Sequence, residues 1–352
     1  MPKANLHLHL TGSMRPATLT ELAGRYGIPA PTAMLGPGTH GWSAFQVRYD
    51  AARAALRTAA DIRRVVTEAV EDNLADGCGW LEIQVDPTSY VERLGSAEAV
   101  VETVLDAVAG APAGVIISSS WARSGEHAAR LATVAARYAD AGVVGFGLSN
   151  DERLGVVAEF APAFRAAAGA GLLGAPHAGF YEAAWHVREC VETLGAQRIG
   201  HGLTAAADPS VVDLLASRSV ALEICPTSYP PFGVSDLAAL PVRALLAAGV
   251  PVTLGSDDPL LFGAHVTDQY RIASDTMGLS DDELATIARH SITASAAPAE
   301  TKRTYMPAST AGSETVPKSR ELSTSTSVVH RFPRHASALA APQQDQRHDN
   351  HD

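Results

Sequence analysis

Short apolar runs alternate with longer helical stretches along most of the chain. Eight runs read as β-strands, and they cover residues 4–10, 80–86, 114–119, 143–148, 171–177, 198–201, 221–225 and 251–254. Between them, segments such as 61–75 and 96–109 place apolar residues at three- and four-residue spacing with charges on the opposite face, as amphipathic helices do. Eight strand-then-helix units is the number that closes a parallel barrel. The pattern therefore predicts an α/β fold, a single (β/α)8 barrel of the TIM type.

Residues 29–61 interrupt this alternation directly after the first strand and helix. The insertion contains a Gly-Pro-Gly turn signal and then a helical stretch that carries Trp42, Phe45 and Tyr49. Aromatic residues on an insertion near the mouth of a barrel favour a helical lid over a substrate, with Phe45 and Tyr49 as substrate contacts. The alternative is a helix that only packs on the end of the barrel.

The chain changes character near residue 298. Residues 301–352 are rich in Ser, Thr, Pro and Gln, carry scattered His and Arg, and show no apolar periodicity. Such a composition lacks the apolar surface that a packed core needs, so a disordered polar tail is expected. The predicted organisation is one barrel domain over residues 1–297 and a C-terminal tail over residues 298–352.

Composition and charge narrow the function classes. The 352 residues are 46% hydrophobic, and the formal net charge is −11 with no Lys/Arg stripe. A nucleic-acid surface needs such a stripe to neutralise phosphates, so no nucleic-acid partner is expected. Three widely spaced cysteines predict neither a disulfide framework nor a structural zinc knuckle. With no signal peptide predicted ahead of the first strand and no apolar run as long as a membrane span, we expect a cytoplasmic protein without a membrane partner. No oligomeric state is predicted.

Two histidines alternate with leucines on the first predicted strand, in the sequence Leu-His-Leu-His-Leu. Residues two apart on a strand share a face, so His7 and His9 project to the same side while the leucines enter the packing. The following Thr-Gly-Ser breaks the strand, which places both rings at its carboxyl end. Neutral imidazole is the commonest metal ligand, so the pair predicts half of a metal site. The alternative is two core histidines with satisfied hydrogen bonds.

Three further strand ends carry polar residues of the same kind. His177 ends the fifth strand, His201 ends the sixth, and the pair Asp257–Asp258 follows the eighth. Active sites of such barrels are built at the carboxyl ends of the strands, so these side chains are expected around one mouth. Three histidines and one aspartate suit a single zinc ion, or another divalent ion, that keeps a position for water. The ion lowers the pKa of this water, and a nearby base takes the proton, which predicts hydrolysis. The alternatives are core or loop histidines and a helix N-cap for the aspartates.

The same residues carry a family resemblance. The motifs are Leu-His-Leu-His-Leu-Thr-Gly-Ser near the start, Pro-His-Ala-Gly at 176–179, Arg-Ile-Gly-His-Gly at 198–202, Leu-Glu-Ile-Cys-Pro-Thr-Ser at 222–228 and Leu-Gly-Ser-Asp-Asp-Pro at 254–259. On these motifs the sequence resembles the adenosine deaminase branch of the metal-dependent amidohydrolase superfamily, which includes the aminodeoxyfutalosine deaminases. The resemblance extends over residues 3–297 and covers the whole predicted barrel.

The resemblance implies a role for each polar residue at the mouth. His7, His9, His177 and Asp257 would bind one zinc ion, His201 would orient and deprotonate the attacking water, and Asp258 would hydrogen-bond N7 of a purine. Attack of the water on C6 of the purine would then release ammonia. Asn150 lies in the loop whose backbone contacts the purine N3, at a position where the family often has glycine.

Three positions depart from the family pattern. The family's His-Ala-Gly is followed by a glutamate that protonates N1 of the purine, and here this position is Phe180, which has no proton to donate. General acid catalysis is commonly worth ~10²–10⁴-fold, so deamination would be severely slowed unless Glu182, two residues on, takes the role. Thr11 replaces the aspartate that binds the ribose 5′-hydroxyl in adenosine-specific members, which fits a substrate modified at the 5′ position. Tyr229 makes the mouth more aromatic than the family pattern.

Three hypotheses follow from these residues. The first is a zinc-dependent hydrolytic deaminase that acts on an adenosine-like, 5′-modified nucleoside. The second is a repurposed enzyme of specialised metabolism, in which the metal assists a different reaction because Phe180 replaces the acid. The third is a binding module without catalysis, which the complete set of metal ligands disfavours. The expected catalytic residues are His201, Asp257 and Glu182, and the expected substrate contacts are Thr11, Phe45, Tyr49, Asn150, Gly179, Phe180, Tyr229 and Asp258.

Overall fold

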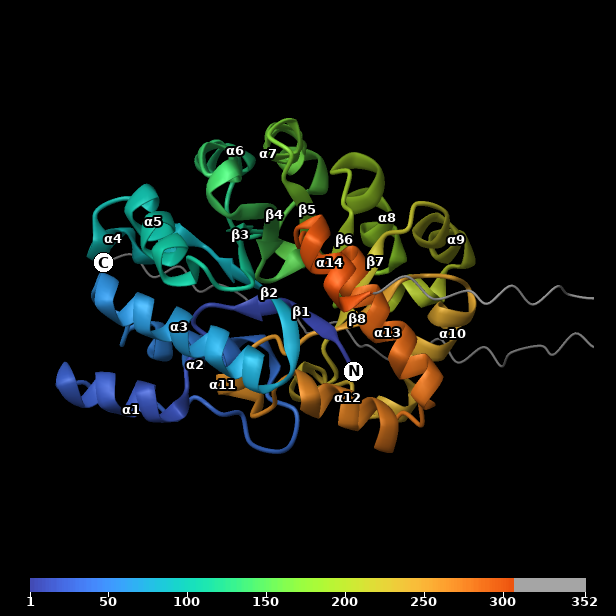
Figure 1. Cartoon of the computed structure of the whole chain (residues 1–352), viewed down its shortest axis with the longest axis horizontal. Helices are drawn as coiled ribbons and strands as arrows, with labels where there is room; N and C mark the ends of the chain where they lie inside the picture. Colours follow the sequence, from blue (N-terminus) through green and yellow to red (C-terminus); the bar gives the residue numbers. More distant parts are fainter. Residues whose placement is uncertain (307–352) are drawn as a thin grey trace, which may run out of the picture. The chain divides into compact units, whose positions relative to one another are not determined.

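The computed structural model describes residues 1–306, which form a barrel of eight parallel strands surrounded by helices (Figure 1). The strands are β1 (Lys3–His9), β2 (Cys78–Val85), β3 (Ala113–Ser120), β4 (Val143–Ser149), β5 (Leu173–Ala178), β6 (Arg198–His201), β7 (Ala221–Ile224) and β8 (Val252–Leu254). Each strand pairs in parallel with the next along the chain. All eight predicted strands are confirmed, with ends that shift by a residue or two.

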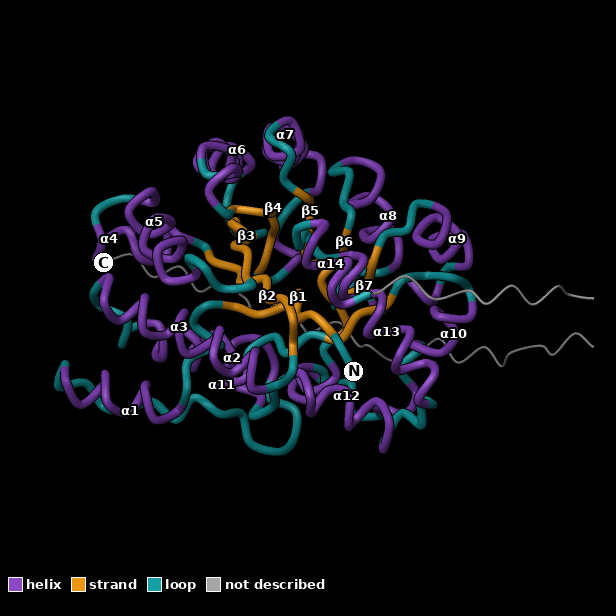
Figure 2. The backbone as a smooth tube through the Cα atoms, in the orientation of Figure 1, coloured by secondary structure: helices purple, strands orange, loops and turns teal. Residues whose placement is uncertain are grey.

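Helices follow the strands and form the outer layer (Figure 2). They are α1 (Pro16–Arg25), α2 (Gly41–Arg53), α3 (Ala59–Ala75), α4 (Val91–Leu94), α5 (Ala97–Val108), α6 (Gly125–Arg137), α7 (Val157–Gly169), α8 (Ala184–Thr193), α9 (Pro209–Ser217), α10 (Val242–Ala247), α11 (Pro259–Phe262), α12 (Val266–Asp275), α13 (Asp281–Ala294) and α14 (Ala299–Tyr305). Local sequence fixes where the long helices begin. At the start of α3, the Thr58 side chain accepts from the Asp61 backbone N–H, and the Asp61 carboxylate accepts from the Thr58 backbone N–H.

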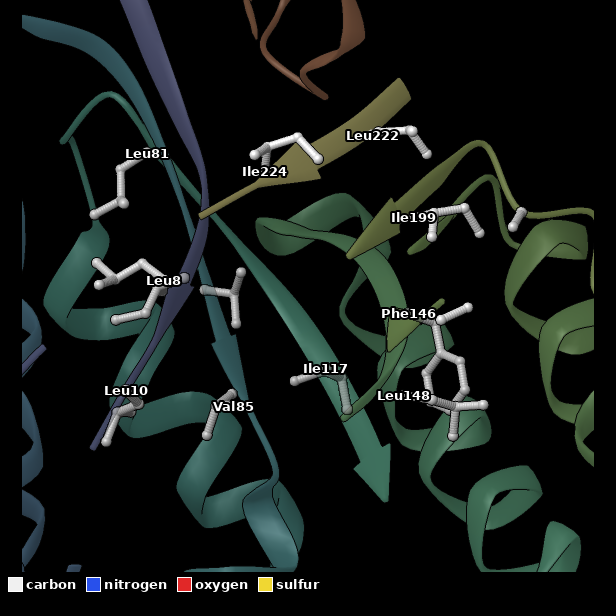
Figure 3. Close-up of a cluster of buried hydrophobic side chains, with 14 of the residues drawn as sticks. Leu8, Leu10, Leu81, Val85, Ile117, Phe146, Leu148, Ile199, Leu222 and Ile224 are labelled. Atoms are coloured by element: carbon white, nitrogen blue, oxygen red, sulfur yellow. The ribbon is translucent and has the colours of Figure 1, made fainter. Parts of the chain in front are cut away.

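Apolar side chains fill the core around the strands. Leu8, Ile117 and Phe146 are among them and are almost completely buried, and Figure 3 shows them with their neighbours on adjacent strands. Burial of one side chain of this size stabilises the fold by ~1.5–3 kcal/mol. The barrel is therefore a firm platform for the loops at the carboxyl ends of its strands.

The barrel closes through a residue of the candidate site. Strand β8 ends at Leu254, and the last link to β1 is a parallel bridge between Leu8 and Asp257. The Asp257 backbone N–H donates to the His7 carbonyl at 2.8 Å, and the His9 N–H donates to the Asp257 carbonyl at 3.1 Å. Closure of the fold thus places Asp257 directly beside the two histidines of β1.

The insertion after the first strand and helix is helical, as predicted. It forms α2, and its Phe45 is buried and stacks on Phe262 at the end of α11, with ring centroids 5.8 Å apart. Whether this helix moves as a lid stays a prediction. Within residues 1–306, every helix is too short or too polar to span a bilayer.

The barrel unit extends past the boundary predicted at residue 297. Residues 299–305 form α14, and Tyr305 packs against the cluster of Ala4, Leu6 and Trp80. Gly79 leaves the space for this ring, because a Cβ atom there would lie 2.2 Å from a Tyr305 ring carbon. The rest of the predicted tail, residues 307–352, lies outside the described residues.

Candidate active site

Four predicted metal ligands converge at the carboxyl ends of β1, β5 and β8. His9 Nε2 lies 3.2 Å from His177 Nε2, and Asp257 Oδ1 lies 3.6 Å from His7 Nε2 and 3.5 Å from His9 Nε2. Ligand atoms about 2.0–2.1 Å from a tetrahedral zinc ion lie roughly 3.3–3.4 Å apart, which is close to these separations. The nitrogen His7 Nε2 is buried and has no hydrogen-bond partner among residues 1–306. The donor set therefore fits one zinc ion.

Outer hydrogen bonds orient two of these rings. His7 Nδ1 bonds the Glu223 carboxylate at 2.8 Å, and His177 Nδ1 donates to the Leu148 carbonyl at 2.7 Å, so both rings present Nε2 to the centre. Such partners fix the tautomer and raise the basicity of a metal-binding histidine. Glu223 is held in turn by Arg198, whose Nε lies 2.6 Å from the other carboxylate oxygen. Arg198 also pairs with Glu82 on β2, so a buried chain of charges supports the site from inside the barrel.

The electrostatics of the cluster favour a bound cation. Burial lowers the pKa of His9 to about 4 and that of His201 to about 3, and it lowers the pKa of His177 as well, so these rings are neutral near pH 7. Neutral imidazole is the form that binds a metal ion. Burial also opposes a charge on His7, but the carboxylates of Asp257 and Glu223 outweigh it and raise the His7 pKa to about 10. This end of the site therefore attracts positive charge.

Left-handed backbone occurs at three of the strand ends that meet here. Asn150 has a φ of 76°, His201 of 66° and Asp257 of 57°, and Ser219 is the only other non-glycine residue of the described chain with a positive φ. Such conformations are costly for residues with a Cβ atom and gather at functional sites. Asparagine tolerates this region better than most residues, so Asn150 can keep a loop geometry that otherwise favours glycine.

A cavity of about 330 Å³ opens above the histidines. Of the predicted site residues, those that line it are His9, Phe45, Tyr49, Asn150, His177, Phe180, His201, Asp257 and Asp258. Asp258 Oδ1 is buried and has no hydrogen-bond partner within residues 1–306. Burial and the neighbouring Asp257 raise the pKa of Asp258 well above its usual range, so its carboxyl group can act as a donor.

Five predicted site residues lie outside the cavity lining: His7, Thr11, Gly179, Glu182 and Tyr229. Thr11 is fully buried, and its hydroxyl lies 2.7 Å from the Tyr90 hydroxyl. Gly179 has a φ of 68°, and a Cβ atom there would meet Val187 at 2.5 Å, so this glycine shapes the turn. Tyr229 is fully buried behind the wall, where its hydroxyl accepts from the Cys225 backbone N–H at 2.9 Å.

The loop after β5 is held by a residue that the sequence analysis did not single out. Glu152, from the loop after β4, lines the cavity and accepts at Oε1 from the backbone N–H groups of Phe180, Tyr181 and Glu182, at 3.0, 2.6 and 2.6 Å. The Phe180 ring packs on His201, with centroids 4.8 Å apart. Backbone hydrogen bonds of this kind leave no trace in a single sequence.

Other cavity residues were also missed. Gln84 on β2 lines the cavity, is 1% exposed, and neither atom of its amide has a partner within the described chain. Arg53 and Tyr90 line it from the end of α2 and from the loop after β2. The signal for Gln84 was available, because it is a polar residue near the carboxyl end of an otherwise apolar strand.

Comparison with known proteins agrees with this geometry. Residues 2–308 match the family model described as adenosine deaminase. The chain is 49% identical over 321 residues to a putative adenosine/adenine deaminase of Streptomyces coelicolor, which covers 86% of this chain and 94% of the relative. It is 34% identical over 311 residues to the aminodeoxyfutalosine deaminase of the same organism, covering 84% of this chain and 80% of the relative. A solved adenine deaminase from Arthrobacter aurescens superimposes with a TM-score of 0.79 at 29% identity, covering 87% of this chain and 97% of that structure.

Proposed function

The chain belongs to the adenosine deaminase family of hydrolytic deaminases, and on this premise we propose that it deaminates an adenosine-like, 5′-modified nucleoside with zinc bound at the histidine cluster. The observation that carries the proposal is the convergence of His7, His9, His177 and Asp257, in which three of the donor pairs lie 3.2 to 3.6 Å apart. A zinc ion held by these residues would supply a Lewis acid that lowers the pKa of a water molecule.

The chain's own residues suit the remaining steps. His201 lines the cavity as a neutral ring, so it can take the proton of the attacking water. Its ring nitrogen Nε2 lies 3.9 Å from Asp257 Oδ2, which would stabilise the imidazolium formed. Burial and Asp257 raise the pKa of Asp258, which favours a protonated carboxyl group that can donate a hydrogen bond to N7 of a purine. Proton transfer to N1 has no donor at position 180, and Glu182 does not line the cavity.

The test is ammonia release by zinc-reconstituted wild-type protein. Adenosine, 5′-deoxyadenosine and aminodeoxyfutalosine are supplied in separate reactions, with a chelator-treated sample as the control. We expect ammonia from at least one of the 5′-modified substrates, and none after metal removal. Absence of ammonia from all three substrates, with one zinc ion bound per chain, would reject the proposal.

A second candidate function rests on Phe180. Its ring lies 4.8 Å from His201 and 5.3 Å from Phe232, so an apolar surface stands beside the base. Such a wall favours a metal-assisted reaction on a less polar substrate, in which the metal polarises a carbonyl or imine group. This candidate predicts metal-dependent turnover of a compound other than the three nucleosides, and it is excluded if aminodeoxyfutalosine or 5′-deoxyadenosine is deaminated at an ordinary enzyme rate.

A further inference from the structure

The cavity has two unlike walls. Trp42, Phe45, Phe180, Phe232 and Phe262 supply aromatic surface, and loops after β2 and β3 together with the end of α2 supply polar and charged groups. A planar base prefers the aromatic wall, where it can stack near the metal ligands. The polar wall is then left for the sugar and for whatever the substrate carries at its 5′ position.

Arg53 is the cation best placed on the polar wall. It is the last residue of α2, its side chain is 25% exposed, and its guanidinium carbon lies 4.9 Å from the centre of the Tyr49 ring. One guanidinium nitrogen, Nη1, pairs with Asp50 at 2.9 Å, while the buried Nε has no acceptor among residues 1–306. Arg123, which is exposed, lines the same cavity and adds a second positive charge.

Neutral hydroxyls and an amide accompany Arg53. The Tyr90 hydroxyl lies 2.7 Å from the Thr11 hydroxyl, and Tyr49 and Tyr90 both line the cavity. Thr11 is shielded behind them, so its side chain does not meet a ligand. The unpartnered amide of Gln84 lies on the strand beside His9.

Each carboxylate that lines the cavity lies at the metal end or has at least one oxygen engaged by the protein. Asp257 and Asp258 belong to the metal end, and Glu152 holds the loop after β5. Asp86 lies on the polar wall, where its Oδ1 accepts from the backbone N–H of Thr88 at 2.9 Å and from the Thr88 hydroxyl. The wall therefore offers a guanidinium and several hydroxyl donors to a ligand, and this chemistry matches an anion better than a neutral hydroxyl.

We infer that Arg53, with Tyr49 and Tyr90, forms a subsite for an anionic group, a phosphate or a carboxylate, on the 5′ side of the nucleoside. A guanidinium binds either oxyanion through parallel N–H···O bonds, which gives it strength and orientation that a neutral donor lacks. The inference rests on the proposed function, because that function places the base at the metal end. It deepens the proposal by naming the charge of the 5′ substituent.

The test measures binding without turnover. Inosine, IMP and the 5′-carboxylic acid of inosine carry the product base and differ only at the 5′ position. Their affinities for the zinc-loaded full chain are measured by calorimetry in wild type, Arg53→Met, Arg53→Lys and Arg57→Met. Arg57 is exposed, lies four residues further along and is outside the cavity, so Arg57→Met controls for a simple loss of net charge. Thermal melts confirm that each variant is folded.

We expect at least one of the two anions to bind wild type about tenfold or more tightly than inosine, and the preferred anion distinguishes a phosphate from a carboxylate site. Arg53→Met should weaken that anion by about 10- to 100-fold and leave inosine within about twofold, because a hydrogen-bonded charge is lost only from the anion complex. Arg53→Lys should retain part of the preference, and Arg57→Met all of it. Equal binding of inosine and both anions, or equal weakening of all three by Arg53→Met, overturns the subsite but leaves the deaminase proposal standing. Failure of all three ligands to bind overturns the subsite, and the separate ammonia assay decides the deaminase proposal.

Discussion

The end of the cavity that carries His7, His9, His177 and Asp257, here the metal end, and the loop after β5 are both held by hydrogen bonds. They present different side chains to the cavity. At the metal end, the backbone itself places the metal-binding side chains. Asp257 closes the barrel by pairing with β1, and its carboxylate faces the histidines. In the loop, Glu152 holds three successive backbone N–H groups, yet the side chain presented at its start is Phe180. The backbone that could present a catalytic side chain is therefore held in place, but the side chain that it presents, Phe180, is apolar.

This difference shows that the backbone of a site and its chemistry are separable. The hydrogen bonds from Phe180, Tyr181 and Glu182 to Glu152 involve main-chain atoms only, so they do not depend on which side chain stands at position 180. At the metal end the side chains cannot be exchanged in this way, because they are themselves the metal ligands. Substitutions at the two regions should therefore have opposite consequences.

The largest effect is expected at the metal end. His177→Ala removes one of the four predicted metal ligands, the one whose Nε2 lies 3.2 Å from His9 Nε2. Zinc affinity should fall by at least about 10³-fold, since binding energies of about 10–16 kcal/mol for four-ligand zinc sites are shared among the ligands. Zinc content by metal analysis and ammonia release should both be lost. His186→Ala removes a buried histidine outside the cluster and should keep its zinc; if His177→Ala also kept one equivalent, the ligand assignment would be wrong.

The second largest expected effect is a gain of deaminase activity from a substitution in the loop after β5. Phe180→Glu places a carboxyl group where the Phe180 ring now lies, 4.8 Å from His201, on a backbone that Glu152 already holds. We expect adenosine deamination to rise by about 10²–10⁴-fold, the usual range for general acid catalysis. Phe180→Gln has the same shape without an acidic proton and serves as the control. An equal gain in both variants would show that the effect is steric.

Loss of the hydrogen bonds from the loop after β5 to Glu152 should lower the free energy of unfolding. Glu152→Ala leaves three partly buried backbone N–H groups without their acceptor. An unsatisfied buried donor costs about 1–3 kcal/mol, so the free energy of unfolding in urea should fall by at least about 2 kcal/mol. Glu182→Ala, which leaves the backbone bonds in place, should change it little. If the two variants were equally stable, the three contacts to Glu152 would not hold the loop.

The smallest expected effect is the pH dependence of the contribution that Glu152 makes to the free energy of unfolding. Burial raises the pKa of Glu152 to about 7, although the three N–H groups oppose the shift. A carboxyl group with a higher pKa in the folded state takes up a proton on folding, so its contribution is full below its unfolded pKa of about 4.3. This contribution is lost as the pH rises through about 7.

Glu152→Gln keeps an acceptor oxygen and removes the titration. The free energy of unfolding of wild type minus that of Glu152→Gln should therefore decrease between about pH 5 and pH 8. His186 Nδ1 lies 3.8 Å from Glu152 and has its own pKa lowered to about 4 by burial, but it is present in both proteins. A difference that is constant or that increases with pH would contradict a raised pKa for Glu152.

Most of the fold could be predicted from the chain, because eight apolar runs at barrel spacing leave few other arrangements. The places of His7 and His9 followed from the two-residue period of a strand, and those of His177 and Asp257 from the rule that strand ends meet at one mouth. Helix α14, which continues past residue 297, was not predicted because it is short and polar, and its packing depends on the Tyr305 ring filling the space beside Gly79.

The remaining features depend on contacts that a local pattern does not encode. Tyr229 was expected at the mouth, but its hydroxyl bonds a backbone N–H behind the wall. Glu152 accepts from backbone N–H groups of a loop that lies about one strand-helix unit further along the chain. Arg53 reaches the cavity from the end of α2, which follows β1, and joins residues from the loop after β2. Side chains of this kind are found only when the loops around the mouth are placed relative to one another.

The most direct measurement is the fate of oxygen and nitrogen in a single reaction. Zinc-loaded wild-type protein is incubated in ¹⁸O-labelled water with adenosine, 5′-deoxyadenosine or aminodeoxyfutalosine, and the products are analysed by mass spectrometry alongside an ammonia assay. We expect one equivalent of ammonia per product molecule and one ¹⁸O atom on the purine ring, with both lost in His177→Ala. A protein that binds one zinc ion and yields neither labelled product nor ammonia from any of the three would contradict this expectation.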